Sequence, residues 1–145
     1  MQQWILMTRK IINFIDPVLL FPLHTGTGLD SWDTASVITL SKTFLGAVEM
    51  NGDLGSWIVA KVTTLYSMFS GASKFEGTGL ASWVITKVTT FQNINRPESP
   101  TFHDATSLTS CNKRGIADAW KGNTAFAATT YVTDWAADTC MVRFE

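Results

Sequence analysis

The sequence has few of the residues on which metal sites and most catalytic sites depend. Its 145 residues include two cysteines and two histidines, and no Cys-x-x-Cys spacing occurs, so a zinc site lacks ligands. The net charge of −1 removes any electrostatic argument for binding nucleic acid or an anionic membrane. No phosphate-binding loop, Gly-x-Ser-x-Gly or His-Glu-x-x-His motif is present. We therefore expect no enzyme activity, no cofactor, no metal and no nucleic-acid partner.

A long uninterrupted hydrophobic run is also missing. The most apolar stretch lies within residues 1–23, where Arg9 and Lys10 precede a run that Asp16 and Pro17 interrupt. That run is too short to span a membrane and is broken where a secretory signal needs a continuous core. We expect no membrane-spanning segment. We interpret residues 1–23 as an apolar cap on the first repeat or as foreign sequence, with a degenerate signal as the remaining alternative.

What the sequence does have is a pattern that recurs about every 25 residues. Successive tryptophans of the pattern are 25 and 26 residues apart, and the valines that follow them keep the same spacing. A fixed period in this range is typical of a solenoid, in which stacked repeats bury apolar faces that no single repeat buries alone. The repeated positions are Trp32, Trp57, Trp83, Val37, Val62 and Val88.

Two periodicities occur within each repeat. The apolar positions in residues 54–59 have a Leu-x-x-Leu-x-Leu-like spacing, which predicts a short strand paired with its equivalents in neighbouring repeats. Residues 65–72 place apolar side chains at i, i+3, i+4 and i+7, which predicts one face of a short helix. The predicted fold class is therefore α/β, a solenoid of short parallel strands and short helices.

The predicted solenoid covers residues 24–110 and contains an inserted loop at 92–101. Pro97 and Pro100 mark this loop, and the repeat pattern resumes at Phe102. Insertions in solenoids collect on the outside of the stack. We therefore expect the loop to leave the packing of the third repeat intact.

The remaining segment, residues 111–145, predicts a C-terminal cap. Its first part predicts a helix with Ile116, Ala119 and Trp120 on one face, and an open solenoid end needs such a cover. Cys111 and Cys140 bracket the segment, so we predict a disulfide between them and an oxidising compartment. Two unrelated buried thiols are the alternative.

The repeat Trp-Asp-x-x-x-Val-x-x-Leu/Met-x-x-x-Phe-x-x-Ala-x-x-Phe/Met resembles that of the BspA-like leucine-rich-repeat family over about residues 27–110. The tail from Leu108 to Cys140 also looks like the terminal cap of some members. The resemblance implies a leucine-rich-repeat solenoid of a secreted or cell-surface protein, with adhesion or protein binding as its role and no catalytic residues. One departure is that Asp33 becomes Ile58 and Val84 in the later repeats.

Two rows of equivalent side chains are candidate binding surfaces. Trp32, Trp57 and Trp83 would stack about 5 Å apart, either as an aromatic binding strip or as a ladder in the core, and we favour the core. A row of threonines allows an ice-binding face, but three ranks are few and β-compatible surface residues are the preferred interpretation. The threonines are Thr39, Thr63, Thr64, Thr89 and Thr90.

Candidate ligand and catalytic groups are scattered. Asp30, Asp33 and Asp53 lie near turns, where an aspartate commonly bonds its own backbone, so we prefer turn chemistry to calcium binding. The two histidines, His24 and His103, fall outside the complete repeats. An enzyme would require a cleft that gathers His103 with carboxylates.

Two functional classes remain. The first is an extracellular or cell-surface recognition module, whose ligand is a protein or a surface glycan. The alternative is a structural spacer, or a fragment of a longer repeat array, without a ligand of its own. We expect a monomer or part of a longer array. A continuous exposed apolar strip would favour recognition, and a uniformly polar exterior would favour the spacer.

Overall fold

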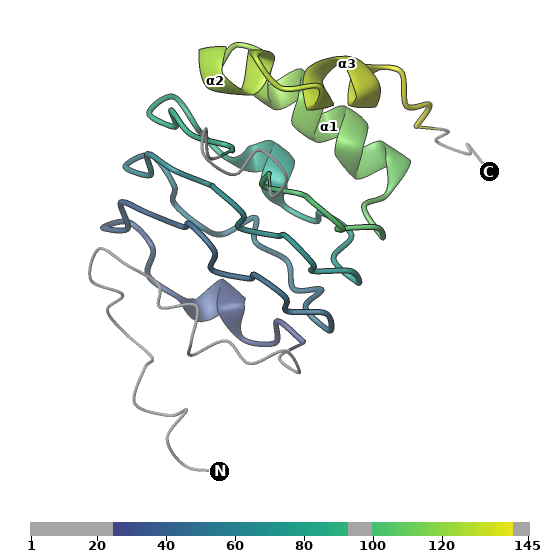
Figure 1. Ribbon diagram of the computed structural model, residues 1–145. Coiled ribbons are helices and arrows are strands. Elements are labelled where there is room, and N and C mark those ends of the chain that lie inside the picture. The colour runs from purple at the N-terminus through teal and green to yellow at the C-terminus, as the bar shows by residue number, and fades with distance from the viewer. Residues whose placement is uncertain (1–24, 93–99, 141–145) are drawn as a thin grey trace, which may run out of the picture.

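The computed structural model describes residues 25–92 and 100–140, which form three stacked layers with helices across one end (Figure 1). The layers comprise residues 25–50, 51–76 and 77–109. Predictions for residues 1–23, for His24 and for most of the 92–101 loop fall outside the described residues. The elements are the 3-10 helices η3 (Leu29–Ser31) and η4 (Leu80–Ser82) and the α-helices α1 (Ser110–Trp120), α2 (Thr124–Ala127) and α3 (Tyr131–Ala136).

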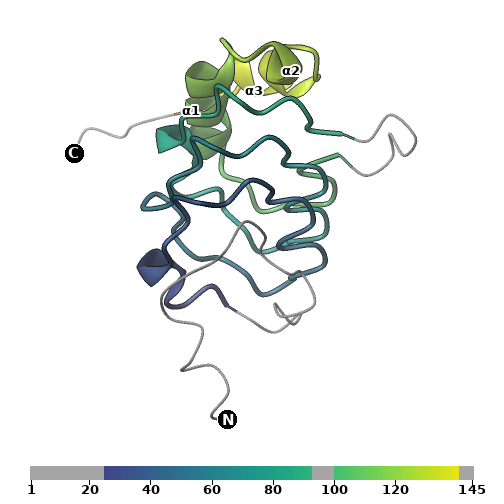
Figure 2. The same cartoon turned by 90° about the vertical axis from the view of Figure 1, so that its left-hand side faces the viewer.

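Backbone hydrogen bonds join equivalent positions of successive layers. The amide of Leu40 donates to the carbonyl of Thr64 (3.2 Å), and the amide of Leu65 donates to the carbonyl of Thr90 (2.9 Å). Thr39, Thr64 and Thr90 form parallel bridges at this point. The 25-residue period therefore sets the register in which the layers stack. Figure 2 shows the stacked layers from the side.

The predicted solenoid of parallel strands and short helices is wrong. Within the described residues the bridges are isolated, no residue belongs to a strand, and there is no sheet. The amide of Val62 donates a hydrogen bond to the carbonyl of Val59 (2.9 Å), and the amide of Met68 donates to the carbonyl of Leu65 (3.0 Å), so each closes a turn. Because turns close on both sides of Thr64, too few extended residues remain for a ladder.

The predicted helix over residues 65–72 is also absent, because successive amides point in different directions. The amides of Phe69 and Gly71 donate to Thr101 (2.8 Å) and His103 (2.7 Å) further along the chain instead of to carbonyls four residues back. Ser67 and Gly71 have φ angles of 50° and 75°, in the left-handed region that an α-helix excludes. The helix-like spacing thus arises from consecutive turns whose inward residues recur every three or four positions.

Two aromatic ladders run through the core in the register that the repeat predicted. Trp57 stacks on Trp32 with ring centroids 6.0 Å apart and on Trp83 at 6.3 Å. The phenylalanine ladder is formed by Phe44, Phe69 and Phe102, with centroid distances of 5.6 and 5.4 Å. A central ring is covered on both faces, so burial of apolar surface holds the layers together where sheet pairing is missing.

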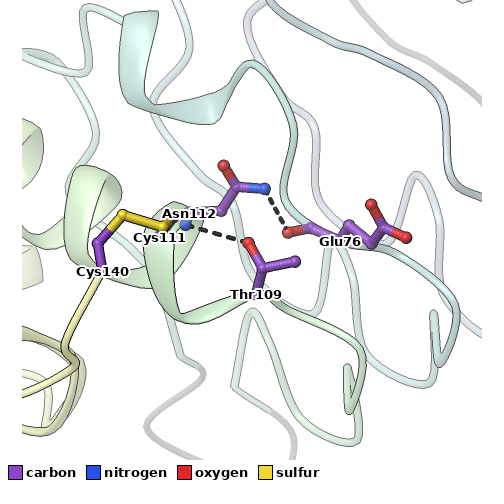
Figure 3. The surroundings of a disulfide bond; sticks show 5 residues. All are labelled: Glu76, Thr109, Cys111, Asn112 and Cys140. Atoms are coloured by element: carbon purple, nitrogen blue, oxygen red, sulfur yellow. Dashed lines mark hydrogen bonds between the residues drawn. A yellow bond between two sulfur atoms is a disulfide. The ribbon is translucent and has the colours of Figure 1, made fainter. Parts of the chain in front are cut away.

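The C-terminal cap predicted from the sequence is present, with its disulfide. The Thr109 hydroxyl accepts a hydrogen bond from the amide of Asn112 (3.2 Å) and so begins α1 (Figure 3). The Asn112 side chain donates to the carbonyl of Glu76 at 2.8 Å, tying α1 to the second layer. Cys111 and Cys140 are bonded, with their Cα atoms 4.4 Å apart. The bond joins the start of α1 to the chain beyond α3.

The buried face of α1 differs from the predicted one at a single position. Ile116 and Trp120 are buried as expected, whereas Ala117 is buried and Ala119 is exposed. Gly115 lies against Ala81 of η4, at a distance that leaves a Cβ atom ordinary van der Waals contact. The helix therefore packs on the third layer with Ala117 turned inward, and Ala119 is free to face a surface groove.

Candidate recognition surface

One side of the stack alternates buried and exposed side chains, and we call it the threonine face, defined by residues 33–39, 58–64 and 84–90. In the second layer Trp57 and Val59 point into the core while Ile58 is 57% exposed. Its equivalent in the third layer, Val84, is 59% exposed. Asp33 takes this place in the first layer, so the exposed apolar position of Ile58 and Val84 recurs in two layers, and the first layer instead exposes Ile38 elsewhere on the same face.

The same face is cationic in its second and third layers. Lys61 and Lys87 occupy equivalent exposed positions, and neither makes an ion pair within the described part of the chain. Residues 57–64 and 83–90 contain no acidic side chain. Two unpaired ammonium groups beside the exposed Ile58 and Val84 make a surface that is both apolar and positively charged.

A groove of about 530 Å³ lies where the threonine face meets the cap. Val84, Thr86 and Thr89 are among the residues of its wall on the third layer, and the cap side includes Ala119, Asn123 and Thr124. The Asn123 side-chain amide donates to the carbonyls of Ile85 and Val88, at 2.8 Å each. This one side chain attaches the cap across the groove and satisfies two carbonyls of the third layer.

The tryptophans considered as a binding strip lie mainly inside the stack. Trp57 and Trp83 are 3% and 4% exposed, and Trp32 is half-buried. The indole Nε1 atoms of Trp57 and Trp83 donate to the carbonyls of Leu29 (2.8 Å) and Leu54 (2.9 Å) in the layer below. Because the rings of Trp57 and Trp83 are covered on both faces and hydrogen-bonded at their edge, the tryptophans form a core ladder, and of the two only Trp83 is among the residues that line the groove.

The aspartates bond to nearby backbone, as turn residues do. Asp33 accepts from the amide of Ala35 (3.1 Å), and Asp53 accepts from the amide of Gly55 (2.8 Å). Asp30 and Asp53 also line a polar hollow of about 400 Å³. The described residues contain no cluster of three or more histidine, cysteine or acidic side chains that would hold a metal ion.

His103 and the threonine hydroxyls have equally local partners. His103 lies 3.3 Å from Asp104, its neighbour in sequence, and both side chains are exposed. Neither the polar hollow nor the groove has His103 in its lining. The hydroxyls of Thr63 and Thr89 donate to the carbonyls of Ile38 and Thr63, at 3.3 Å each. These bonds follow the stacking of the layers.

Sequence reasoning did not find the groove, because its two walls come from different parts of the chain. Residues 119–124 meet the third layer only once the cap has folded over it. A signal was present in the substitution of Asp33 by Ile58 and Val84 in later repeats. A large apolar residue at a position that elsewhere carries a charge indicates an exposed site.

Three stacked repeats closed by a disulfide-linked helical cap define a repeat protein. The family described as "Mycoplasma protein of unknown function, DUF285" matches residues 23–110, more than half of the chain, and the chain belongs to this family. No curated protein and no solved structure matches the chain significantly. In the part of the chain that the structure describes, no helix has the length and apolar character needed to cross a membrane.

Proposed function

We propose that this chain is a non-catalytic recognition module of a secreted or cell-surface protein, which acts in adhesion or protein recognition. The observation that carries the proposal is the pair Ile58 and Val84, exposed at equivalent positions of adjacent layers and continuing into the groove. Burial of such a side chain by a partner contributes about 1.5–3 kcal/mol. A partner that covers both side chains gains a specific apolar anchor in a cationic surround.

Two features support placement outside the cytoplasm. The first is the disulfide between Cys111 and Cys140, because disulfides form and persist in oxidising compartments. The resemblance of the repeat to the BspA-like surface proteins points the same way. Proteolysis of intact cells, followed by detection of the cap peptides, would test surface display directly.

The spacer alternative has less support. A passive spacer requires an exterior without apolar patches, because exposed apolar surface invites association. The paired Ile58 and Val84 do not fit that requirement. The recognition function is therefore the one that the surface favours.

The test uses the full chain, biotinylated and applied to arrays of purified extracellular-matrix proteins and glycans. We expect saturable binding that the double variant Ile58→Lys/Val84→Lys weakens by about tenfold or more, because it removes the apolar anchor. The matched control is Leu45→Lys/Val48→Lys, since these side chains are 48% and 40% exposed and lie outside the threonine face. Absence of any ligand, or equal losses in the two double variants, would contradict the proposal.

A further inference from the structure

The bonds that join the layers end in an open edge at the third layer. At each junction a carbonyl of one layer accepts a hydrogen bond from an amide of the next layer. The carbonyl of Ile38 accepts from the amide of Thr63, and the carbonyl of Thr63 accepts from the amide of Thr89, at 2.9 Å each. The equivalent carbonyl of the last layer is that of Thr89. The amide that would complete the junction is that of Phe91. Within the described residues neither group has a hydrogen-bond partner.

The groove lies beside this edge. Thr89 forms part of its wall, and small residues of the cap, Ala119 and Gly122, stand among those opposite. In the cap, the side-chain amide of Asn123 donates hydrogen bonds to the carbonyls of Ile85 and Val88 in the third layer. It makes no hydrogen bond to the carbonyl of Thr89. The groove therefore has room for a main chain where a fourth layer would otherwise continue the stack.

We propose that this groove binds an extended acidic peptide segment, which adds to the third layer as a parallel fourth layer. The inference rests on the proposed recognition function and names its partner chemistry. The peptide's amide would donate to the carbonyl of Thr89, which repeats one bond of the junction between layers. Phe91, which packs on Trp120 and Phe126 and is buried, would keep its place under the cap. One apolar side chain would cover Val84.

The positive charge of two lysines near the groove indicates that the bound peptide is negatively charged. Lys87 is exposed and lies in the sequence between Thr86 and Val88, two residues of the groove wall, and Lys61 is exposed at the equivalent position one layer away. Neither ammonium group has an ion-pair partner in the described chain, and residues 83–90 carry no acid. A carboxylate on the peptide supplies the missing partner and steers its approach.

The first experiment measures fluorescence anisotropy of a labelled hexapeptide, glutamate-valine-threonine-valine-glutamate-glycine, titrated with the full chain. We expect saturable binding that weakens with salt. Replacement of both glutamates by lysine should lower the affinity about tenfold, because it removes the charge complement. Methylation of the two central amide nitrogens should lower it at least as much, because main-chain hydrogen bonds provide the affinity of an added strand. Equal binding of the methylated peptide would overturn the proposal.

The second experiment blocks the groove. Ala119→Tyr places a ring in the groove from an exposed helical position, and we expect it to abolish peptide binding. Ala127→Tyr makes the same change at an exposed position outside the groove and should leave binding unchanged. Circular dichroism and the denaturation midpoint establish that both variants are folded. Unimpaired binding by folded Ala119→Tyr would overturn the proposal.

The two proposals fail in different ways. If no acidic peptide binds while the Ile58→Lys/Val84→Lys variant still loses an array ligand, the peptide inference is wrong and the recognition function stands. If Ala119→Tyr instead loses a glycan ligand and peptides do not bind, the groove serves a glycan and the peptide inference is again wrong. If neither array ligands nor peptides bind, both proposals are contradicted.

Discussion

The indole ring of Trp120 stacks on that of Trp83, with ring centroids 6.2 Å apart and ring planes inclined by 21°. Trp120 comes from α1 rather than from a repeat, and it stands outside the 25-residue spacing. It nevertheless continues the ladder that Trp32, Trp57 and Trp83 form. The cap thus closes the open end of the core with the same side chain that the repeats use internally.

The two stacked indoles differ in their hydrogen bonding, and the difference can be measured. Trp83 donates to the carbonyl of Leu54, whereas the buried Nε1 of Trp120 has no hydrogen-bond partner among the residues that the structure describes. Trp83→Phe loses a bond, while Trp120→Phe removes an unsatisfied donor. We expect Trp83→Phe to lower the free energy of unfolding by at least about 1 kcal/mol more than Trp120→Phe does. Urea denaturation of both variants provides the comparison, and equal losses would contradict it.

Phe69 occupies the centre of the phenylalanine ladder and is fully buried. It stacks on Phe44, Phe75 and Phe102. We expect Phe69→Ala to destabilise the protein by about 3–5 kcal/mol, because the ring is lost from between two layers. Leu45→Ala, at a position 48% exposed, is the control and should cost less than about 1 kcal/mol. A comparable small loss for Phe69→Ala would show that the ladder does not carry stability.

Gly79 approaches the second layer more closely than any side chain permits. A Cβ atom there would clash with the backbone amide nitrogen of Gly55, and the φ angle of Gly79 is 87°. Gly28 precedes η3 as Gly79 precedes η4 and has a φ of 82°, but a Cβ atom there would meet no atom of the described residues within 4 Å.

Substitution of these two glycines separates backbone strain from layer contact. Gly28→Ala should cost about 1–2 kcal/mol, the penalty of the left-handed conformation. Gly79→Ala carries the same penalty and also forces the layers apart, so we expect an additional loss of about 1–3 kcal/mol. Thermal denaturation followed by circular dichroism measures both. Equal losses of stability in the two variants would mean that the layers can move apart at Gly79 without an energetic cost.

The disulfide ties α1 to the end of the described chain across 29 residues of separation. In the chain-entropy account, closing a loop of this length stabilises the folded state by about 3–4 kcal/mol. We expect reduction, or the double variant Cys111→Ser/Cys140→Ser, to lower the free energy of unfolding by that amount. Chemical denaturation with and without reductant measures the loss. Mass spectrometry of non-reduced peptides should show the linked pair, and two free thiols in secreted material would contradict it.

The local elements within the repeats could not be predicted from the sequence, because their patterns have more than one structural solution. Apolar residues at i, i+3, i+4 and i+7 in residues 65–72 also suit consecutive turns with left-handed Ser67 and Gly71. Likewise, the Leu-x-x-Leu-x-Leu-like spacing of residues 54–59 suits a strand, yet among the described residues of the second layer only Thr64 forms bridges to its neighbours. Which solution forms depends on where the amides find acceptors in the neighbouring layers.

The period of the repeat by itself determined which residues stack. Trp57 falls on Trp83, and Phe69 on Phe44, because equal spacing brings equivalent apolar side chains together whatever the backbone does between them. Phe102 follows Phe69 after a longer interval, because the inserted loop lies between them, and it still joins the same ladder. The cysteines likewise marked the disulfide of the cap. Only the tertiary structure decided the course of the backbone within each layer, the inward turn of Ala117 and the groove between Thr89 and Ala119. These depend on contacts between segments distant in sequence, and the packing of layers and cap settles them only when the chain has folded.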